Sequence, residues 1–212
     1  MLLFPDSLLL SRLRSIPHPP NHERFIALLS LFAAAASLSA ETYAIDSVHS
    51  SVGFTIRHLV SNFSSSFTKV SGTIAYDPAA VEKSSVEATI AIDSVATANE
   101  KRDAHIKSPD FFDAAKFPTA TFKSKSWKKT GENTFDVTGD LTIKDVTKEV
   151  VLKTTLIGTG PGMGGATLTG WSATTAIKKS DFGLAGPAML SAVLGDDVAI
   201  AISVEAGHKP AK

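Results

Sequence analysis

Histidine and aspartate lie close together at two places in this sequence of 212 residues, and such pairs are typical of acid–base and hydrolytic chemistry. Asp46 precedes His49 by three positions, and Asp103 precedes His105 by two. A hydrolase of the Ser-His-Asp type also needs a nucleophilic serine, which often lies in a Gly-x-Ser-x-Gly elbow. The sequence contains no such motif. We therefore expect no catalytic residue. A hydrolase-type enzyme that uses His and Asp residues at a barrel mouth is the alternative interpretation.

The sequence also gives only weak signals for a metal or cofactor site. The histidines His49, His58 and His105 follow no ligand spacing such as His-Glu-x-x-His, and the chain has no cysteine. The absence of cysteine excludes disulfides, thiolate metal sites and cysteine nucleophiles. We expect neither a metal nor a cofactor.

The run Gly160–Gly165 reads GPGMGG and formally matches the glycine pattern GxGxxG. A dinucleotide site requires this pattern to follow a strand and to open a helix. Here a proline lies inside the run and strand-like patterns flank it on both sides. We exclude a dinucleotide site and predict a loop over residues 158–165.

Charge gives no sign of a nucleic-acid partner, because 21 basic residues balance 21 acidic ones. The N-terminal segment instead resembles a targeting sequence. Phe25–Ala36 is an apolar run preceded by Arg24, and the small residues of 37–40 follow it. The run is shorter than the roughly 20 apolar residues of a stable membrane span.

We therefore expect residues 1–40 to be a signal peptide with an N-terminal extension, cleaved near Ala40. Residues 41–212 would then be one exported domain, either periplasmic or secreted.

Apolar and polar residues alternate along most of the remaining chain. This period, with many Val, Ile, Thr and Phe residues, indicates about eight half-buried antiparallel strands. They are expected at 52–58, 70–76, 86–92, 120–127, 137–143, 150–156, 169–177 and 198–204. Such strands can close into a barrel without free sheet edges, so the predicted class is an all-β, eight-stranded antiparallel barrel.

One segment, Ala98–Asp113, breaks the alternation. Asn99 is a good N-cap for a short helix, and Ser108-Pro109 can begin a second turn. A short helical segment in a β-rich chain predicts a cap over one barrel mouth. An ion pair between Arg102 and Asp103 would fix this segment to the barrel.

A barrel of about eight strands is either packed solid or hollow enough for one small ligand. Several expected inward residues are small, which favours a cavity: Gly72, Ala88, Gly139 and Ala173. The glycines have a second interpretation, because glycine in a strand also marks bends and bulges.

Several motifs resemble the YceI family. They are the opening run 45–54 with Arg57-His58-Leu59, the segment DSVATANEKRDAHIKSPDFFDAAKFPTATF at 93–122, Thr138–Ile143, Val146–Lys148 and Lys179–Gly183. The resemblance extends over residues 42–205. It implies an extended, lipocalin-like barrel with an apolar tunnel for a polyisoprenoid, an isoprenoid quinone or a fatty-acid-like amphiphile. It also implies export, no catalytic activity and, in some members, a homodimer.

The chain departs from the family pattern at two places. Ser64-Ser65 stands where relatives often have Arg-Gly, near the expected polar head group of the ligand. Asp145 and Glu149 replace residues of a Gly-Val-Thr-Lys-Pro run, which we interpret as a hairpin change.

Under this resemblance, a long-chain amphiphilic lipid is the expected partner, and a bound isoprenoid or quinone would be a ligand rather than a cofactor. The candidate contacts for its tail are apolar: Val52, Phe54, Ile56, Ile74, Ile90, Phe111, Phe112, Phe117, Leu141 and Ile202. The candidates for its head group are hydrogen-bond donors: His49, His58, Arg102 and His105. The other interpretations are that the apolar residues form a plain core, that the histidines are structural, or that the barrel binds no lipid.

Overall fold

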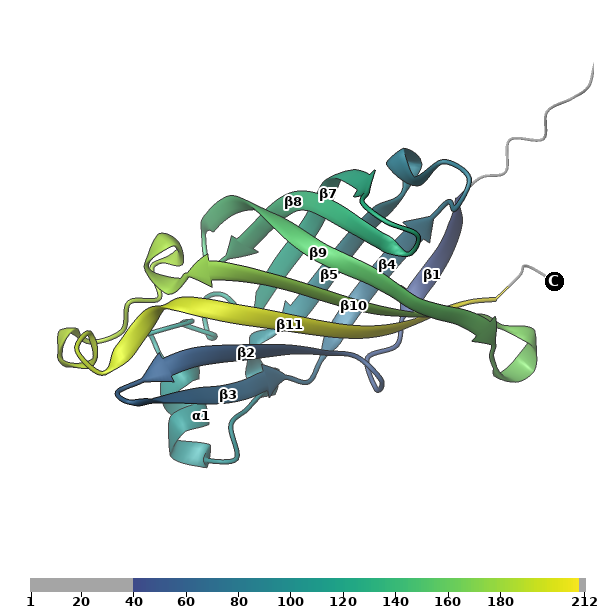
Figure 1. Ribbon diagram of the computed structural model, residues 1–212. Coiled ribbons are helices and arrows are strands. Elements are labelled where there is room, and N and C mark those ends of the chain that lie inside the picture. The colour runs from purple at the N-terminus through teal and green to yellow at the C-terminus, as the bar shows by residue number, and fades with distance from the viewer. Residues whose placement is uncertain (1–39, 210–212) are drawn as a thin grey trace, which may run out of the picture. The chain divides into compact units, whose positions relative to one another are not determined.

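The computed structural model describes residues 40–209, which form a β-barrel with one short α-helix (Figure 1). The predicted signal peptide and its N-terminal extension lie outside the described residues. No helix within residues 40–209 is long and apolar enough to cross a membrane. The strands are β1 (Glu41–Ile45), β2 (Ser51–His58), β3 (Ser61–Phe67), β4 (Val70–Tyr76), β5 (Ser85–Ala91), β6 (Val95–Ala96), β7 (Thr119–Lys129), β8 (Thr134–Ile143), β9 (Val146–Pro161), β10 (Thr167–Lys178) and β11 (Leu194–His208).

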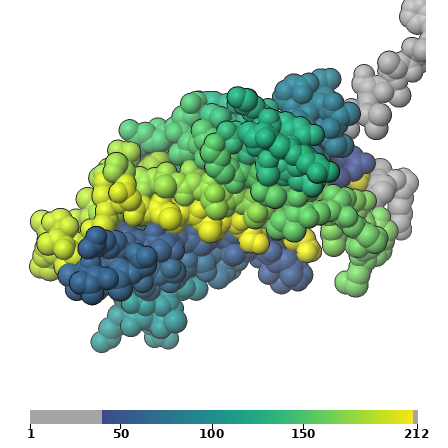
Figure 2. Space-filling model, viewed as in Figure 1, coloured from purple at the N-terminus to yellow at the C-terminus, as the bar shows by residue number. Residues whose placement is uncertain are grey.

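The barrel closes through β11, which pairs with both β10 and β1. The hydrogen-bonded order β1-β4-β5-β7-β8-β9-β10-β11 returns to β1, because Ala44 and Ile45 pair with Gly207 and Ala206. All pairings are antiparallel. The first part of β11 instead pairs with β2, and β3 and β6 continue the sheet from there. In Figure 2 the yellow β11 separates the green β10 from the dark blue β2 and β3.

The predicted fold class, an eight-stranded antiparallel barrel, is confirmed, and each predicted strand range overlaps an observed strand. The loop predicted over residues 158–165 is wrong in its first half. There β9 continues to Pro161 because its last four residues pair with Thr167–Gly170 of β10. The glycine run therefore lies at the β-hairpin between β9 and β10.

The predicted helix is present as α1 (Glu100–Lys107). Asn99 is its N-cap, since the Asn99 side chain accepts a hydrogen bond from the backbone N–H of Arg102 at 3.0 Å. The residues after it form hydrogen-bonded turns, with Phe111 N donating to Ser108 O at 3.1 Å.

Four aromatic residues pack together at one end of the barrel interior. Trp171 contacts Tyr76 and Trp127 edge-on, with ring centroids 5.0 and 5.8 Å apart, and Phe135 lies within 6.2 Å of all three. Burial raises the pKa of the Tyr76 hydroxyl above its ordinary value. Because Phe135, Trp127 and Trp171 are almost completely buried, this cluster closes the barrel at that end.

Candidate functional site

The barrel interior is hollow. It contains two adjoining cavities with volumes of about 120 and 320 Å³, which we call the inner and the outer cavity. Four residues line both of them: Val52, Ile90, Leu141 and Ile200. The two cavities therefore adjoin along the barrel interior, and we call them together the chamber.

Alternation along β11 shows how the strands build this chamber. Val198, Ile200, Ile202 and Val204 face inward, while the residues between them face outward. The first three are only half-buried although they lie inside the barrel, and only Val204 is buried. The interior surface is thus left open along most of β11 and becomes packed toward the aromatic cluster.

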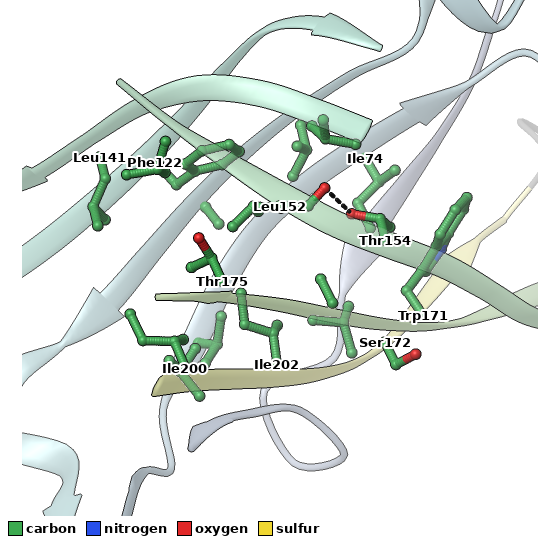
Figure 3. A pocket seen from close by; sticks show the side chains of 18 of the residues that line it. Ile74, Phe122, Leu141, Leu152, Thr154, Trp171, Ser172, Thr175, Ile200 and Ile202 are labelled. Atoms are coloured by element: carbon green, nitrogen blue, oxygen red, sulfur yellow. Dashed lines mark hydrogen bonds between the residues drawn. The ribbon is translucent and has the colours of Figure 1, made fainter. Parts of the chain in front are cut away.

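The inner cavity is bounded by the aromatic cluster, and both tryptophans belong to its wall. Figure 3 shows its apolar side chains converging from opposite sides of the barrel, with Phe122 and Leu152 facing Ile200 and Ile202. The few hydroxyl groups in the wall bind partly to the protein itself. Thr154 Oγ1, for example, donates to the carbonyl of Leu152 at 3.3 Å.

The outer cavity lies under α1 and the loop between β10 and β11. Five phenylalanines line it, and all but Phe111 are joined by ring contacts: Phe54, Phe63, Phe67, Phe111 and Phe112. All of its ionisable wall residues are basic: His58, Arg102, His105 and Lys179. The chamber is therefore apolar at its inner end and bears basic groups at its outer end.

Nine of the ten predicted tail contacts lie in the chamber wall. Ile74 and Ile202 line the inner cavity, and Val52, Ile90 and Leu141 line both cavities. The remaining four line the outer cavity: Phe54, Ile56, Phe111 and Phe112. Their contact with a ligand stays a prediction.

Phe117 does not lie in the wall of either cavity. Its ring is covered by the Lys116 ammonium at 4.9 Å, and its backbone N–H donates to Asp113 O at 2.8 Å. Phe117 therefore lies in the turn before β7, outside the chamber wall.

Three of the four predicted head-group residues, His58, Arg102 and His105, line the outer cavity. His49 does not. It lies in the exposed turn between β1 and β2, where its Nδ1 is 2.9 Å from Asp46 Oδ2 and 3.8 Å from Glu205 Oε1. The hydrogen bond with Asp46 raises the pKa of His49 and lowers the pKa of Asp46. His49 therefore belongs to a surface ion-pair group.

Arg102 is held in the cavity wall by Thr97. Its Nε donates to Thr97 Oγ1 at 3.0 Å and its terminal nitrogen donates to Thr97 O at 2.7 Å. The guanidinium carbon lies 4.3 Å from the ring centroid of Phe63, a cation–π contact. Asp103 also binds Thr97, by accepting from its backbone N–H at 2.9 Å. The prediction of an Arg102–Asp103 ion pair is wrong, because both side chains form hydrogen bonds with Thr97 instead.

His105 is fixed at the edge of the outer cavity. Its Nε2 lies 2.8 Å from Asp110 Oδ2, and its ring meets Phe111 edge-on at 5.2 Å. Phe111 in turn lies against Gly186, where a Cβ would come within 2.7 Å of the ring. Gly186 also has a positive φ of 74°. The loop after β10 therefore needs glycine at this position to let Phe111 cover the cavity.

Sequence reasoning missed Lys179 as a cavity residue, although a signal was present. Ala173, Thr175 and Ile177 face the chamber from β10, and Lys179 is the next position with the same parity. A lysine after a strand is ordinarily exposed, but this one retains only 8% of its surface.

The four small inward candidates have two different roles. Ala88 and Ala173 line the inner cavity, as expected for residues that leave space. Gly72 has a φ of 140°, and a Cβ there would lie 2.0 Å from Glu87 O, so it allows β4 to approach β5. Gly139 makes room for Phe122. The two glycines thus follow the second interpretation, that of backbone approach and packing.

Neither departure from the family pattern touches the chamber. Ser64 Oγ bonds to Thr55 Oγ1 at 2.8 Å, and Ser65 Oγ donates to Ala96 O. Glu149 accepts from Lys125 Nζ at 3.2 Å on the outside of the barrel. The serines stabilise strand pairing, and Glu149 belongs to the exposed face of the β8–β9 hairpin.

Comparison with known proteins gives a consistent family match. The YceI-like domain family matches residues 43–206. A UPF0312 protein of Pseudomonas savastanoi pv. phaseolicola is 39% identical over 176 residues, which is 82% of this chain and 92% of the relative.

Two solved structures are similar in fold. The crystal structure of Burkholderia cenocepacia BcnA superposes with a TM-score of 0.70 at 25% identity, covering 76% of this chain and 98% of BcnA. A polyisoprenoid binding domain from Saccharophagus degradans, implicated in plant cell wall breakdown, gives a TM-score of 0.58 at 18% identity. It covers 79% of this chain and 98% of that domain, and at this identity the likeness concerns the fold alone.

Proposed function

Because the chain belongs to the YceI-like family and encloses an apolar chamber, we propose that it binds one long-chain amphiphile inside the barrel. The ligand class is a polyisoprenoid, an isoprenoid quinone or a fatty-acid-like molecule. The observation that carries this proposal is the apolar lining of the chamber, with basic groups at its outer end and aromatic rings at its inner end. The Saccharophagus protein of the same fold is described as a polyisoprenoid binding domain.

The energetics of such a chamber favour a tail. Each CH₂ group that leaves water contributes about 0.8 kcal/mol, so a long tail can bind tightly with few polar contacts. Part of this is lost to ordering of the tail. The half-buried wall residues Ile56, Ile200 and Ile202 supply apolar surface that a tail would cover. The inner end is already packed, so the tail would enter from the outer end.

The arrangement of the histidines supports binding rather than catalysis. Within residues 40–209, no hydroxyl group forms a hydrogen bond with an imidazole nitrogen. His49 binds Asp46, His105 binds Asp110, and His208 binds the Thr42 carbonyl. Such a bond is the usual signature of a Ser-His nucleophile.

The setting of this function is also part of the proposal. We infer that the protein is exported, with cleavage near Ala40, and that it acts as a carrier or store of an amphiphile in the periplasm or outside the cell. The apolar run Phe25–Ala36 and the small residues after it support export. We also propose that the protein forms a homodimer.

Expression of the full chain in a bacterial host, followed by gentle purification, tests these points. Native mass spectrometry should show a bound species that solvent extraction identifies as a long-chain amphiphile, and the same spectrum reports monomer or dimer. The mature N-terminus should begin at Glu41. A protein that carries no amphiphile, and that binds neither an added prenol nor a fatty acid, would contradict the proposed function.

A further inference from the structure

Lys179 brings a charged group into the chamber from the end of β10. It is the first residue of the short 3-10 helix η4 (Lys179–Phe182), directly after the strand. Its neighbour Lys178 faces outward, where Nζ bonds to Asp197 Oδ1 at 2.8 Å. The two consecutive lysines therefore lie on opposite sides of the barrel wall, one in solvent and one in the outer cavity.

The partners of Lys179 leave its ammonium group incompletely satisfied. Nζ donates to the carbonyl of Ala185 at 3.3 Å, a long hydrogen bond, and lies 3.9 Å from Asp196 Oδ1. The Asp196 carboxylate is already engaged by Ser180, through its N–H at 2.9 Å and its hydroxyl at 2.7 Å. An ammonium group has three N–H donors, so Lys179 retains donors for a further partner.

Of the three other basic residues of the outer cavity, Arg102 and His105 are more completely bound, and His58 is exposed to solvent. Thr97 and Phe63 hold Arg102, and Asp110 holds His105. No carboxylate belongs to the wall of the outer cavity, in the part of the chain that the structure describes. A buried cation in an apolar wall is costly unless it is paired, and no wall residue completes that pairing.

We propose that the ligand carries an anionic head group, a carboxylate or a phosphate, and that the Lys179 ammonium binds it in the outer cavity. The tail then extends past Leu141 and Ile200 into the inner cavity. This inference rests on the proposed function and adds the class of head group and the residue that selects it. An anionic oxygen would form the short charge-assisted hydrogen bond that Ala185 and Asp196 do not provide.

The test compares amphiphiles that share one tail. Hexadecanoate, hexadecyl phosphate and hexadecanol are titrated against delipidated full-length protein at neutral pH, by displacement of a fluorescent fatty acid. The wild-type protein should bind at least one anion about ten- to a hundredfold more tightly than the alcohol. Whichever anion binds more tightly identifies the head group.

Lys179→Met should remove this preference, because it weakens the binding of the anions much more than the binding of hexadecanol. Lys178→Met is the matched control, because it removes an outward lysine from the adjacent position, and it should keep the preference. Lys179→Arg retains a cation and should keep most of the preference, which covers the case in which Lys179→Met does not fold.

Equal wild-type affinities for acid, phosphate and alcohol would overturn the assignment of an anionic head group while leaving amphiphile binding intact. A preference that survives in Lys179→Met would also overturn it. Failure of all three amphiphiles to bind would instead contradict the proposed function itself.

Discussion

Gly139 of β8 lies directly against the ring of Phe122 on β7. A Cβ added to Gly139 would come within 2.5 Å of Phe122 Cζ and within 2.5 Å of the Lys123 carbonyl oxygen. Real Cβ atoms do not tolerate such distances, so an alanine here must displace the ring or the strand. Phe122 forms part of the inner cavity wall, and Gly139 thus shapes the chamber without touching it.

Gly139→Ala is therefore expected to destabilise the protein by about 1–3 kcal/mol, the cost of overpacking a core. Gly158→Ala in β9 is the matched control, because no atom lies within 4 Å of a Cβ at that position. It should be neutral or slightly stabilising, since alanine reduces the freedom of the unfolded chain. Urea unfolding of both variants measures the difference, and equal losses would contradict the packing role of Gly139.

The barrel could be predicted from the sequence because, along most of the chain, the residues of the apolar alternation are those that face the barrel interior. Val198, Ile200 and Ile202 alternate with outward residues, and they do face the interior. β3, in contrast, reads SNFSSSF and carries little of this signal. It forms a strand because it pairs with β2 over its whole length. Local composition does not predict such tertiary pairing.

The candidate site was predictable in its apolar wall and less so in its polar contacts. Alternation places the strand residues among the tail candidates in the chamber wall, because side chains on one face of a strand share one environment. Donor chemistry alone could not separate His49, which binds Asp46 at the surface, from His105 in the cavity wall. Lys179 was missed because its residue type predicts exposure, whereas its position continues the inward face of β10.

Ala173 offers a direct test of how far a tail extends into the barrel. It faces the inner cavity from β10, two positions after Trp171 of the aromatic cluster and four before Ile177 of the outer cavity. Ala173→Leu should fill part of the inner cavity, whose volume is only about 120 Å³. Affinity should fall at least about tenfold for amphiphiles with long tails and change little for short ones, because each excluded CH₂ forfeits about 0.8 kcal/mol.

Ala176→Leu is the matched control for this cavity-filling change. Ala176 is exposed on the outer face of the same strand, so the added methyl groups remain outside the barrel. Affinities measured over a series of fatty acids should follow the wild-type protein. Unchanged affinity for long tails in Ala173→Leu would show that the tail does not reach the inner cavity.

Thr97 is expected to fix α1 to the barrel through its hydroxyl group. Thr97 is buried, and its Oγ1 accepts from Arg102 Nε and donates to Asp103 Oδ1. Thr97→Val keeps the shape but leaves both charged partners short of one hydrogen bond, at an expected cost of about 1–3 kcal/mol. Thr97→Ser retains the hydroxyl and should lose less.

Denaturant unfolding and amide hydrogen exchange check this prediction. Exchange should accelerate for the amides of α1 (Glu100–Lys107) in Thr97→Val more than in Thr97→Ser. If the valine variant were as stable as the serine variant, the hydroxyl would not be the anchor.

The surface pair of Asp46 and His49 predicts a pH dependence that can be followed residue by residue. The hydrogen bond with Asp46 raises the pKa of His49, with smaller help from Glu205, and it lowers the pKa of Asp46. A raised histidine pKa stabilises the fold below the unfolded value of about 6.5, and this contribution disappears as pH rises through the raised value. A lowered aspartate pKa stabilises the fold above about 3.9 and is lost as pH falls through the lowered value.

The pair should therefore contribute fully between about pH 4 and pH 6.5, and only modestly because both groups are exposed to solvent. An NMR titration of the His49 ring should give a midpoint above the ordinary histidine value. Asp46→Asn should lower that midpoint more than Glu205→Gln, because Asp46 provides the hydrogen bond whereas Glu205 lies 3.8 Å away. A midpoint that is equally insensitive to both changes would mean that the pair does not persist in solution.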